Sequence, residues 1–203
     1  MTGETKKVLI SGFEPFGGSR LNPSQLLVEA LSQSSIDCVE LAAIVLPVEF
    51  ERATELLLEK IRDFQPDVVI AFGQAEGRKA IMPEKIAVNL DNAGIADNSG
   101  DQRQNRVIDA DGNDGYFTTL PVEKMIEAIT SAGIPAELSL SAGNFVCNHV
   151  FYELQRTLIK TEIKSGFVHL PLLTEQSAEF PGQPTMTLDE MIQGARAAIL
   201  STL

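Results

Sequence analysis

The sequence predicts a single α/β domain, an α/β/α sandwich built on a mostly parallel, doubly wound sheet. Three observations predict this fold. The chain has 203 residues and 44% hydrophobic content, which is enough for one well-buried domain spanning residues 1–203. Short apolar runs alternate with stretches of helical periodicity along most of the chain. The connections between these runs are long enough for crossovers that cover both faces of a parallel sheet with helices.

The first half of the chain alternates predicted strands and helices. Residues 8–11 form an apolar strand that Gly12 ends. Asn22 is a typical N-cap and Pro23 suits the first helical position, so a helix should begin there and run to about Leu31. The other elements of this half are a strand at 39–46, an amphipathic helix at 49–64, a strand at 68–72 that Gly73 ends, and a strand at 85–90.

The second half begins with an irregular segment. Residues 91–115 are polar and rich in Asn, Asp and Gly, which predicts a long excursion of the kind that a hairpin contains. After it we expect a helix from Pro121 to near Gly133, a strand at 136–140, a helix at 148–160, a strand at 167–170 and a last helix at 188–200.

The charge balance excludes some partners. The formal net charge is 16 − 28 = −12, and Lys and Arg form no cluster, so nucleic acid and anionic membrane surfaces are not expected partners. The most apolar run, residues 41–48, is far shorter than the roughly 20 residues that span a bilayer. The first residues lead into a strand pattern without the apolar region of a signal peptide. We therefore expect a cytoplasmic protein.

The chain has two cysteines, Cys38 and Cys147. Cys38 begins an apolar stretch, which predicts an inert, buried strand residue. A disulfide between the two is not expected in a reducing compartment. No CxxC pair is present, and Cys147 and His149 alone offer too few ligands, so we expect no metal site.

Ligands of such folds bind outside the carboxyl ends of the parallel strands. Cys147 follows the predicted strand at 136–140 and stands at or beside the start of the next helix. Free backbone N–H groups and the helix dipole favour a thiolate there, and they can also stabilise an oxyanion. Cys147 is therefore a candidate nucleophile; the alternative is a small residue that packs the helix start.

A cysteine nucleophile needs a proton acceptor, and His149 and His169 are the two histidines of the chain. Side chains two residues apart in a helix diverge by about 200°, which argues against His149 as the partner of Cys147. His169 ends the strand at 167–170 at the functional edge, so it is the preferred base, with a buried core histidine as the alternative. A carboxylate usually orients such a histidine, and spacing leaves Glu84, Asp91 and Asp97 open.

Four blocks and one strand resemble the pyroglutamyl-peptidase I (pyrrolidone-carboxylate peptidase) family of cysteine peptidases. Their order and spacing match along nearly the whole chain. The matching segments are residues 12–18 (Gly-Phe-Glu-Pro-Phe-Gly-Gly) with Asn22-Pro23, residues 73–75 through Pro83-Glu84, Asp97-Asn98 with Gly100, residues 145–149 (Phe-Val-Cys-Asn-His), and His169-Leu170-Pro171.

The resemblance implies a cysteine-type omega-peptidase that hydrolyses the amide bond after an N-terminal pyroglutamyl residue through an acyl-enzyme. It implies a triad of Cys147, His169 and Glu84, no cofactor, peptides with N-terminal pyroglutamate as partners, and a homo-oligomer, a tetramer or a dimer. It also implies a substrate pocket, for which the expected residues are Phe13, Phe16, Asn22, Gln74, Phe145 and Val146.

Two departures from the family pattern bear on activity. Gly94 stands where typical members have an Arg, and Glu76 stands where they have a Gly. These changes leave open a member with weak, lost or redirected activity, acting as a binding module or on another acylated amine. Arg78 and Arg103 are candidates to replace the missing Arg. A nucleotide-binding protein is a weaker alternative, because residues 12–18 lack GxGxxG spacing and no GK[ST] follows.

Overall fold

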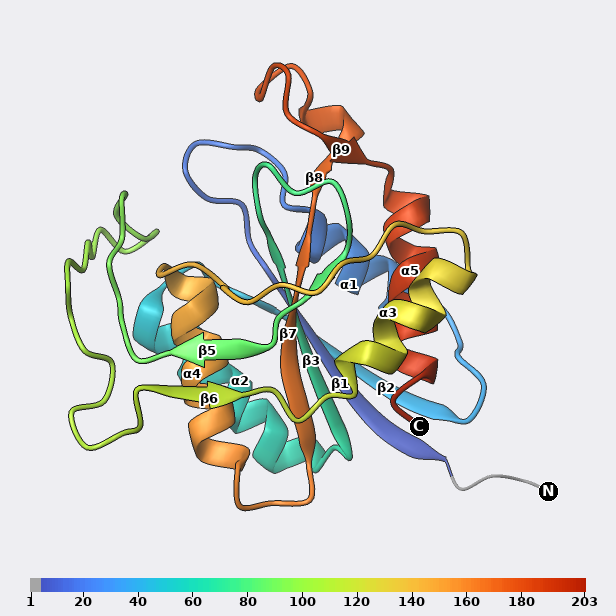
Figure 1. The fold of residues 1–203 in the computed structure, drawn as a ribbon, viewed down its shortest axis with the longest axis horizontal. Coiled ribbons are helices and arrows are strands. Elements are labelled where there is room, and N and C mark those ends of the chain that lie inside the picture. Colours follow the sequence, from blue (N-terminus) through green and yellow to red (C-terminus); the bar gives the residue numbers. More distant parts are fainter. Residues whose placement is uncertain (1–4) are drawn as a thin grey trace.

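The computed structural model describes residues 5–203 and contains a five-stranded main sheet (Figure 1). The strand order is β2-β1-β3-β7-β4. The four parallel strands are β1 (Lys6–Phe13), β2 (Val39–Leu46), β3 (Val68–Gln74) and β7 (Lys164–Leu170), and the antiparallel edge strand is β4 (Met82–Pro83). The parallel strands run in the same direction, so their carboxyl ends form one edge.

Helices cover both faces of this sheet. On one face lie α1 (Pro23–Ser32), α3 (Val122–Ser131) and α5 (Leu188–Leu200), and on the other lie α2 (Phe50–Phe64) and α4 (Val146–Leu158) (Figure 1). The predicted α/β/α sandwich with a mostly parallel, doubly wound sheet is thus confirmed. Within the described residues, 5–203, no helix has the length and apolar composition needed to cross a membrane.

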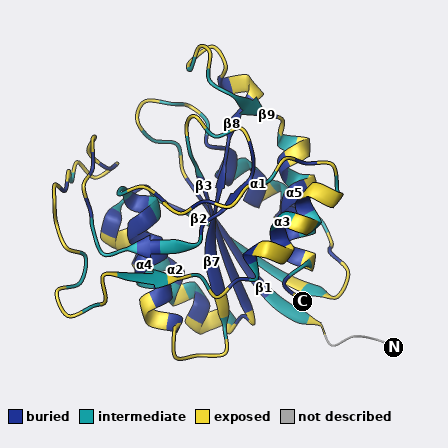
Figure 2. Cartoon of the chain, viewed as in Figure 1, coloured by how far each residue is buried: buried dark blue, intermediate teal, exposed yellow. Residues whose placement is uncertain are grey.

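Successive residues of the central strands belong to different layers. Val8 and Ile10 pack in the cluster that includes α1, α3 and α5, whereas Leu9 packs in the cluster that includes α2 and α4. All three are fully buried, and the central strands are dark in Figure 2 while each helix is exposed along one side. Burial on both faces explains why these strands have nearly continuous apolar sequences.

The α1 helix begins where the sequence predicted, and its start lies close to β1. Asn22 is the N-cap, and its side chain accepts a hydrogen bond of 3.0 Å from the N–H of Ser24. A Cβ atom at Gly12 would be 2.2 Å from the carbonyl oxygen of Ser24. Glycine at position 12 therefore lets the helix start approach the end of β1, beside the candidate site.

Five shorter elements complete the chain. They are β5 (Ile86–Val88), β6 (Gly115–Phe117), β8 (Leu172–Leu173), the 3₁₀ helix η1 (Thr174–Gln176) and β9 (Thr185–Met186). The antiparallel pair of β5 and β6 encloses the polar segment 89–114, which matches the expected excursion within a hairpin.

Two predicted strands were wrong. Residues 136–140 form no strand and make isolated bridges, Ile81 with Ala136 and Glu84 with Ser139. Leu138 and Leu140 point to solvent, so this apolar segment lies at the edge of the fold and not inside the sheet. The strand predicted at 85–90 is only β5, which pairs outside the main sheet, while β4 occupies the edge beside β7.

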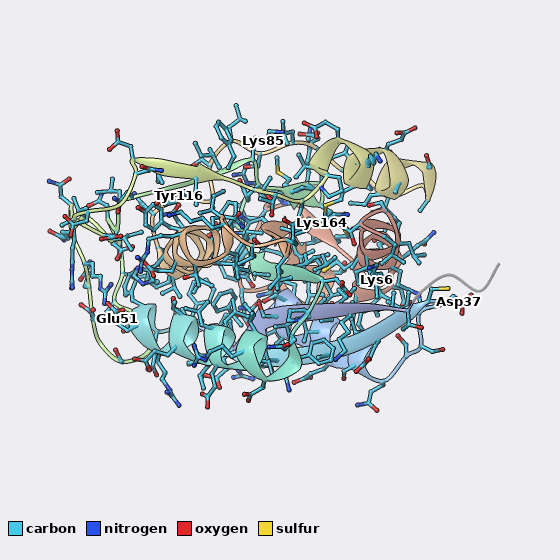
Figure 3. The ribbon with its side chains drawn as sticks, turned by 90° about the horizontal axis from the view of Figure 1, so that it is seen from below. Lys6, Asp37, Glu51, Lys85, Tyr116 and Lys164 are labelled. Carbon is cyan, nitrogen blue, oxygen red and sulfur yellow. The ribbon has the colours of Figure 1, made fainter. Side chains whose placement is uncertain are left out.

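The prediction for Cys38 was also wrong. Cys38 is exposed and has a φ of 61°, the left-handed region, because β2 begins only at the next residue. Cys38 lies at the amino ends of the strands. It follows Asp37, which Figure 3 labels near Lys6, the first residue of β1. Cys38 is thus at the opposite end of the sheet from Cys147.

Candidate active site

Cys147 lies in the first turn of α4, at the carboxyl edge of the sheet. Its sulfur occupies space beside Gly73 of β3, where an added Cβ atom would be 2.9 Å from Sγ. Gly73 is paired with His169 in the register of β3 and β7. The cysteine and the histidine therefore meet at the same residue of the sheet, and the absent side chain of Gly73 makes room for the sulfur.

Glu84 contacts the ring of His169. Its Oε1 lies 2.7 Å from Nδ1 of His169, and both residues are buried, with Glu84 fully so. Glu84 directly follows β4, which pairs with β7, and its N–H donates to the carbonyl of Phe167 at 2.9 Å. The edge strand thus holds the carboxylate against the ring nitrogen.

The two other candidate carboxylates have different partners. Asp91 lies 2.9 Å from Nδ1 of His149 and accepts a hydrogen bond of 3.0 Å from Arg103. Asp97 accepts a hydrogen bond of 3.1 Å from the N–H of Phe50, at the start of α2. Neither contacts His169, so geometry selects Glu84 from the alternatives that spacing left open.

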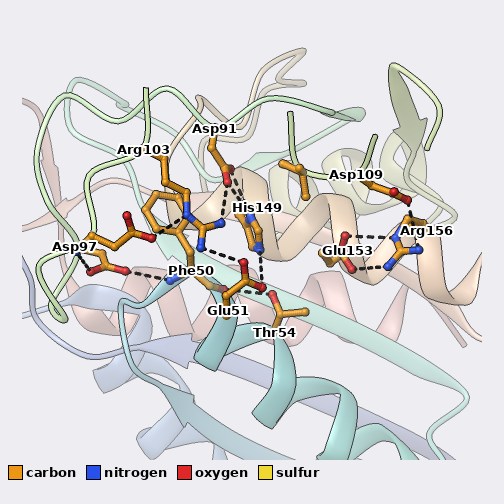
Figure 4. Close-up of polar contacts among 12 residues, drawn as sticks. Phe50, Glu51, Thr54, Asp91, Asp97, Arg103, Asp109, His149, Glu153 and Arg156 are labelled. Carbon is orange, nitrogen blue, oxygen red and sulfur yellow. Dashed lines mark hydrogen bonds and ion pairs between the residues drawn. The ribbon is translucent and has the colours of Figure 1, made fainter. Parts of the chain in front are cut away.

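Arg103 is buried and forms the centre of an ionic network (Figure 4). Its three guanidinium nitrogens bond Asp91 at 3.0 Å, Glu51 at 2.8 Å and Asp101 at 2.8 Å, and the guanidinium lies 4.3 Å from the ring centre of Phe50. Burial alone would lower the pKa of Arg103, but the hydrogen bonds to the three carboxylates outweigh it and raise the pKa. All three nitrogens of Arg103 are therefore engaged by carboxylates, and none is left open to replace the Arg that is missing at position 94.

The sulfur of Cys147 is tightly enclosed although the residue is partly exposed at the cleft. Burial, followed by the negative charge of Glu84, raises the pKa of the thiol to about 12, while the backbone hydrogen bond at the helix start acts in the opposite direction. The enclosure of the sulfur and the nearby carboxylate thus favour the thiol form of Cys147 over the thiolate. The backbone hydrogen bond at the helix start does favour the thiolate, as expected, but desolvation of the charged form outweighs it.

A small cavity of about 10 Å³ opens beside the sulfur. Its walls are mostly apolar. They are formed by Phe13, Phe16, Asn22, Val48, Gln74, Phe145, Val146 and Cys147. All six residues that we expected to bind substrate thus surround one cavity. Val48 was missed, although its position just after the strand at 39–46 marks the same carboxyl edge.

The amide of Gln74 is held in one orientation. Its Oε1 accepts a hydrogen bond of 3.0 Å from Nε2 of Gln176, which is itself fully buried. The same Nε2 group also bonds the hydroxyl of Ser19 and the carbonyl of Leu21, each at 3.2 Å. Nε2 of Gln74 is therefore left as a donor at the cavity wall. Sequence reasoning missed Gln176, because 102 residues separate it from Gln74.

A wider cleft of about 270 Å³ lies on the other side of the sulfur. It shares Phe16, Gln74, Phe145 and Cys147 with the small cavity and adds His169, which does not line that cavity. Cys147 thus stands between an apolar cavity and an open cleft. Within the part of the chain that the structure describes, no group of three or more His, Cys, Asp or Glu residues is arranged to hold a metal ion.

A cysteine at a helix start, beside a carboxylate-bound histidine on an α/β/α sandwich, is the arrangement of cysteine hydrolases. Comparison with known proteins identifies the family. A family model described as pyroglutamyl peptidase matches residues 6–203. The chain belongs to the pyroglutamyl peptidase family of cysteine-type omega-peptidases.

Relatives and solved structures agree with this assignment. The chain is 45% identical to the pyrrolidone-carboxylate peptidase of Vibrio vulnificus over 198 residues, covering 98% of this chain and 93% of that one. It is 44% identical to that of Lactobacillus acidophilus, covering 95% and 96%. The pyroglutamyl peptidase I structure from Bacillus amyloliquefaciens superposes with a TM-score of 0.94 at 38% identity, covering 97% and 94%. A mutant pyrrolidone carboxyl peptidase from Pyrococcus furiosus gives 0.91 at 35% identity, covering 97% of both chains.

Proposed function

We propose that this protein hydrolyses the amide bond after an N-terminal pyroglutamyl residue of peptides, with Cys147 as nucleophile, His169 as general base and Glu84 as the group that orients His169. The observation that carries the proposal is the meeting of Cys147 and His169 at Gly73, with Glu84 Oε1 2.7 Å from Nδ1 of His169. The names of the relatives support the substrate class.

The first half of the reaction forms an acyl-enzyme. The Cys147 thiol proton moves to Nε2 of His169, because Glu84 occupies Nδ1. Sγ forms a bond to the pyroglutamyl carbonyl carbon, and the carbonyl electron pair moves to oxygen. The first N–H groups of α4 have no acceptor within the helix and stabilise this oxyanion. The C–N bond then breaks, and His169 gives its proton to the leaving amine, which leaves a thioester.

The second half releases the pyroglutamate. His169 takes a proton from a water molecule, whose oxygen attacks the thioester carbonyl. When the tetrahedral intermediate collapses, the C–S bond breaks and the proton returns from His169 to the Cys147 sulfur. Burial and the charge of Glu84 raise the pKa of the Cys147 thiol to about 12, so the thiol needs His169 as the acceptor of its proton.

The lining of the cavity suits the substrate in polarity. Pyroglutamate is a neutral five-membered lactam, so its site needs no counter-ion for an α-amino group. Phe13, Phe16 and Phe145 supply apolar walls, and Nε2 of Gln74 supplies a donor for the lactam carbonyl. A substrate without the lactam would leave this donor unpaired, which disfavours prolyl and alanyl analogues.

One observation favours a second candidate function, a family member with weak or redirected activity. Gly94 is exposed, and no atom lies within 4 Å of a Cβ built there. No described side chain therefore lies within 4 Å of the Cβ position where the family pattern has an Arg, and Arg103 is engaged by three carboxylates. Such a protein would bind pyroglutamyl peptides but release their amines slowly.

Release of a chromogenic amine from its pyroglutamyl derivative tests the proposal, with the prolyl and alanyl derivatives as controls. We expect selective hydrolysis of the pyroglutamyl compound, and its loss in a Cys147→Ala variant whose circular dichroism matches the wild type. Hydrolysis of the prolyl compound at an equal rate would contradict the assignment. Saturable pyroglutamyl binding without turnover would favour the second candidate.

The homo-oligomer and the cytoplasmic location stay predictions. Three exposed apolar residues lie on neighbouring segments: Phe117, Leu138 and Leu140. The segments are neighbours because the carbonyl of Ser139 accepts a hydrogen bond from the N–H of Lys85, the residue before β5. Such residues suit a contact between copies. Light scattering coupled to size exclusion would measure the mass in solution and decide between a monomer and a dimer or tetramer.

A further inference from the structure

The two spaces beside Cys147 take different parts of the substrate. In the proposed reaction His169 must give a proton to the leaving amine, so the amine has to lie on the side of the sulfur where His169 is. His169 lines the wide cleft and not the small apolar cavity. The wide cleft therefore receives the leaving group, that is, the peptide that follows the pyroglutamyl residue.

Arg78 lies on the wall of this cleft. It is half-buried, and its Nη2 donates to the carbonyl of Ser141 at 3.3 Å and to the hydroxyl of Ser139 at 3.4 Å. Ser139 is bridged to Glu84, the partner of His169, so the guanidinium is anchored near the catalytic histidine.

The guanidinium of Arg78 has no anionic partner among the described residues. No carboxylate lies within ion-pair distance of it, and its Nε and Nη1 groups make no hydrogen bond to residues 5–203. Arg103 differs in this respect, because its three nitrogens meet three carboxylates. Among residues 5–203, Arg78 is held by neutral groups and has two N–H donors without a partner in the cleft. Such an arginine is suited to bind an anionic ligand.

Arg78 is the source of positive charge at this cleft. Among the described residues that line it, Arg78 is the only Lys or Arg, while Glu76 is exposed on the same wall. The chain as a whole has a formal charge of −12, so distant charges do not attract an anion to this cleft. Any preference for an anionic leaving group would have to come from Arg78 itself.

We propose that Arg78 binds a carboxylate of the leaving group, which makes short or acidic pyroglutamyl peptides the preferred substrates. The carboxylate is either the C-terminus of a pyroglutamyl dipeptide or the side chain of an acidic residue that follows pyroglutamate. Both present two coplanar oxygens, which the planar guanidinium pairs with two parallel N–H groups. The inference rests on the proposed function and names its substrate class more closely.

Two matched substrate pairs test the inference by the ratio of kcat/KM within each pair. Pyroglutamyl-alanine against pyroglutamyl-alanine amide reports on a C-terminal carboxylate. Pyroglutamyl-glutamate amide against pyroglutamyl-glutamine amide reports on an acidic side chain. We expect the wild type to favour the acid by about tenfold in at least one pair, as one charge-assisted hydrogen bond supports. The pair that shows the preference identifies the source of the carboxylate.

Three variants attribute the preference to Arg78. Arg78→Gln should bring the ratio close to one, and Arg78→Lys should keep part of it. Lys79→Gln is the matched control, because it removes the same charge from the next residue, whose side chain is exposed and does not line the cleft. It should leave both the ratio and the activity unchanged. Glu76→Gln, which removes a negative charge from the cleft, should raise the ratio.

The outcomes separate this inference from the proposed function. A wild type that hydrolyses the amides but shows a ratio near one in both pairs overturns the role of Arg78 and leaves the peptidase assignment standing. A preference that persists in Arg78→Gln also overturns it. If Arg78→Gln fails to fold, the ratios of the wild type, Arg78→Lys and Glu76→Gln still show whether Arg78 binds the carboxylate of the leaving group. Absence of hydrolysis of every pyroglutamyl compound counts against the proposed function instead.

Discussion

The sulfur of Cys147 lies in the space that a side chain at Gly73 would fill: a Cβ atom there would be 2.9 Å from Sγ and 2.7 Å from the ring of Phe167. Both distances are shorter than real Cβ contacts, so the nucleophile can take its position only beside a residue without a side chain. The absence of a side chain at Gly73 of β3 therefore makes room for the nucleophile.

Gly73→Ala should reduce kcat/KM by about a hundredfold or more, because a displacement of roughly 1 Å at a reacting group has that effect. Overpacking against Phe167 should also lower the free energy of unfolding by about 1–3 kcal/mol. Amine release and urea denaturation measure the two effects. Gly94→Ala is the matched control, since a Cβ at Gly94 meets no atom within 4 Å. Full activity in Gly73→Ala would show that the sulfur works from another position.

The two histidines should respond differently to replacement. His169→Ala should reduce turnover as much as Cys147→Ala, because residues that act as one unit are not additive. His149→Ala should keep substantial turnover but lose about 1–3 kcal/mol of stability, because Asp91 loses a buried partner. Glu84→Gln should fall between these extremes in activity. An inactive His149→Ala beside an active His169→Ala would mean that the other histidine is the base.

Alkylation by iodoacetamide should report a protonated Cys147 in the resting protein. Since burial and the charge of Glu84 raise its thiol pKa to about 12, labelling of Cys147 should keep increasing with pH beyond 9, where free cysteine levels off. Cys38 is exposed and should be labelled first without loss of activity. Mass mapping separates the sites, and Cys147→Ala reports Cys38 alone. Rapid labelling of Cys147 that stays constant from pH 5 to 8 would instead indicate a resting thiolate–imidazolium pair.

Gly94→Arg should raise kcat/KM on a pyroglutamyl amide, by up to the roughly 10²–10³-fold that one oxyanion-site donor contributes. The 91–97 segment reaches the site, because the N–H of Asn92 donates to the carbonyl of Asn144, which lines the cleft. Gly94 is outside the left-handed region and open to solvent, so the larger side chain should fold without strain. Activity and urea denaturation are measured together. A stable variant that is no faster than an already fast wild type would show that the site works without this Arg.

Local signals in the sequence were sufficient for much of the fold. The α5 helix and β2 have the predicted bounds, because each is an amphipathic or apolar run with clear ends. The segment 136–140 has a similar apolar composition, yet it makes only isolated bridges at an exposed edge. Composition does not distinguish an interior strand from an edge segment, since the difference lies in which neighbours are available to form hydrogen bonds.

The sequence by itself determined the layered α/β fold, the edge at which a site forms, and Cys147 and His169 as its candidate residues, because apolar periodicity and the carboxyl-edge rule are local properties of the chain. Only the tertiary structure decided that Glu84 faces His169 while Asp91 faces His149, and that Gln176 holds Gln74. It also decided that burial and the charge of Glu84 raise the pKa of Cys147. Hydrogen-bond partners and desolvation depend on groups far apart in the chain, which become neighbours only when the layers pack.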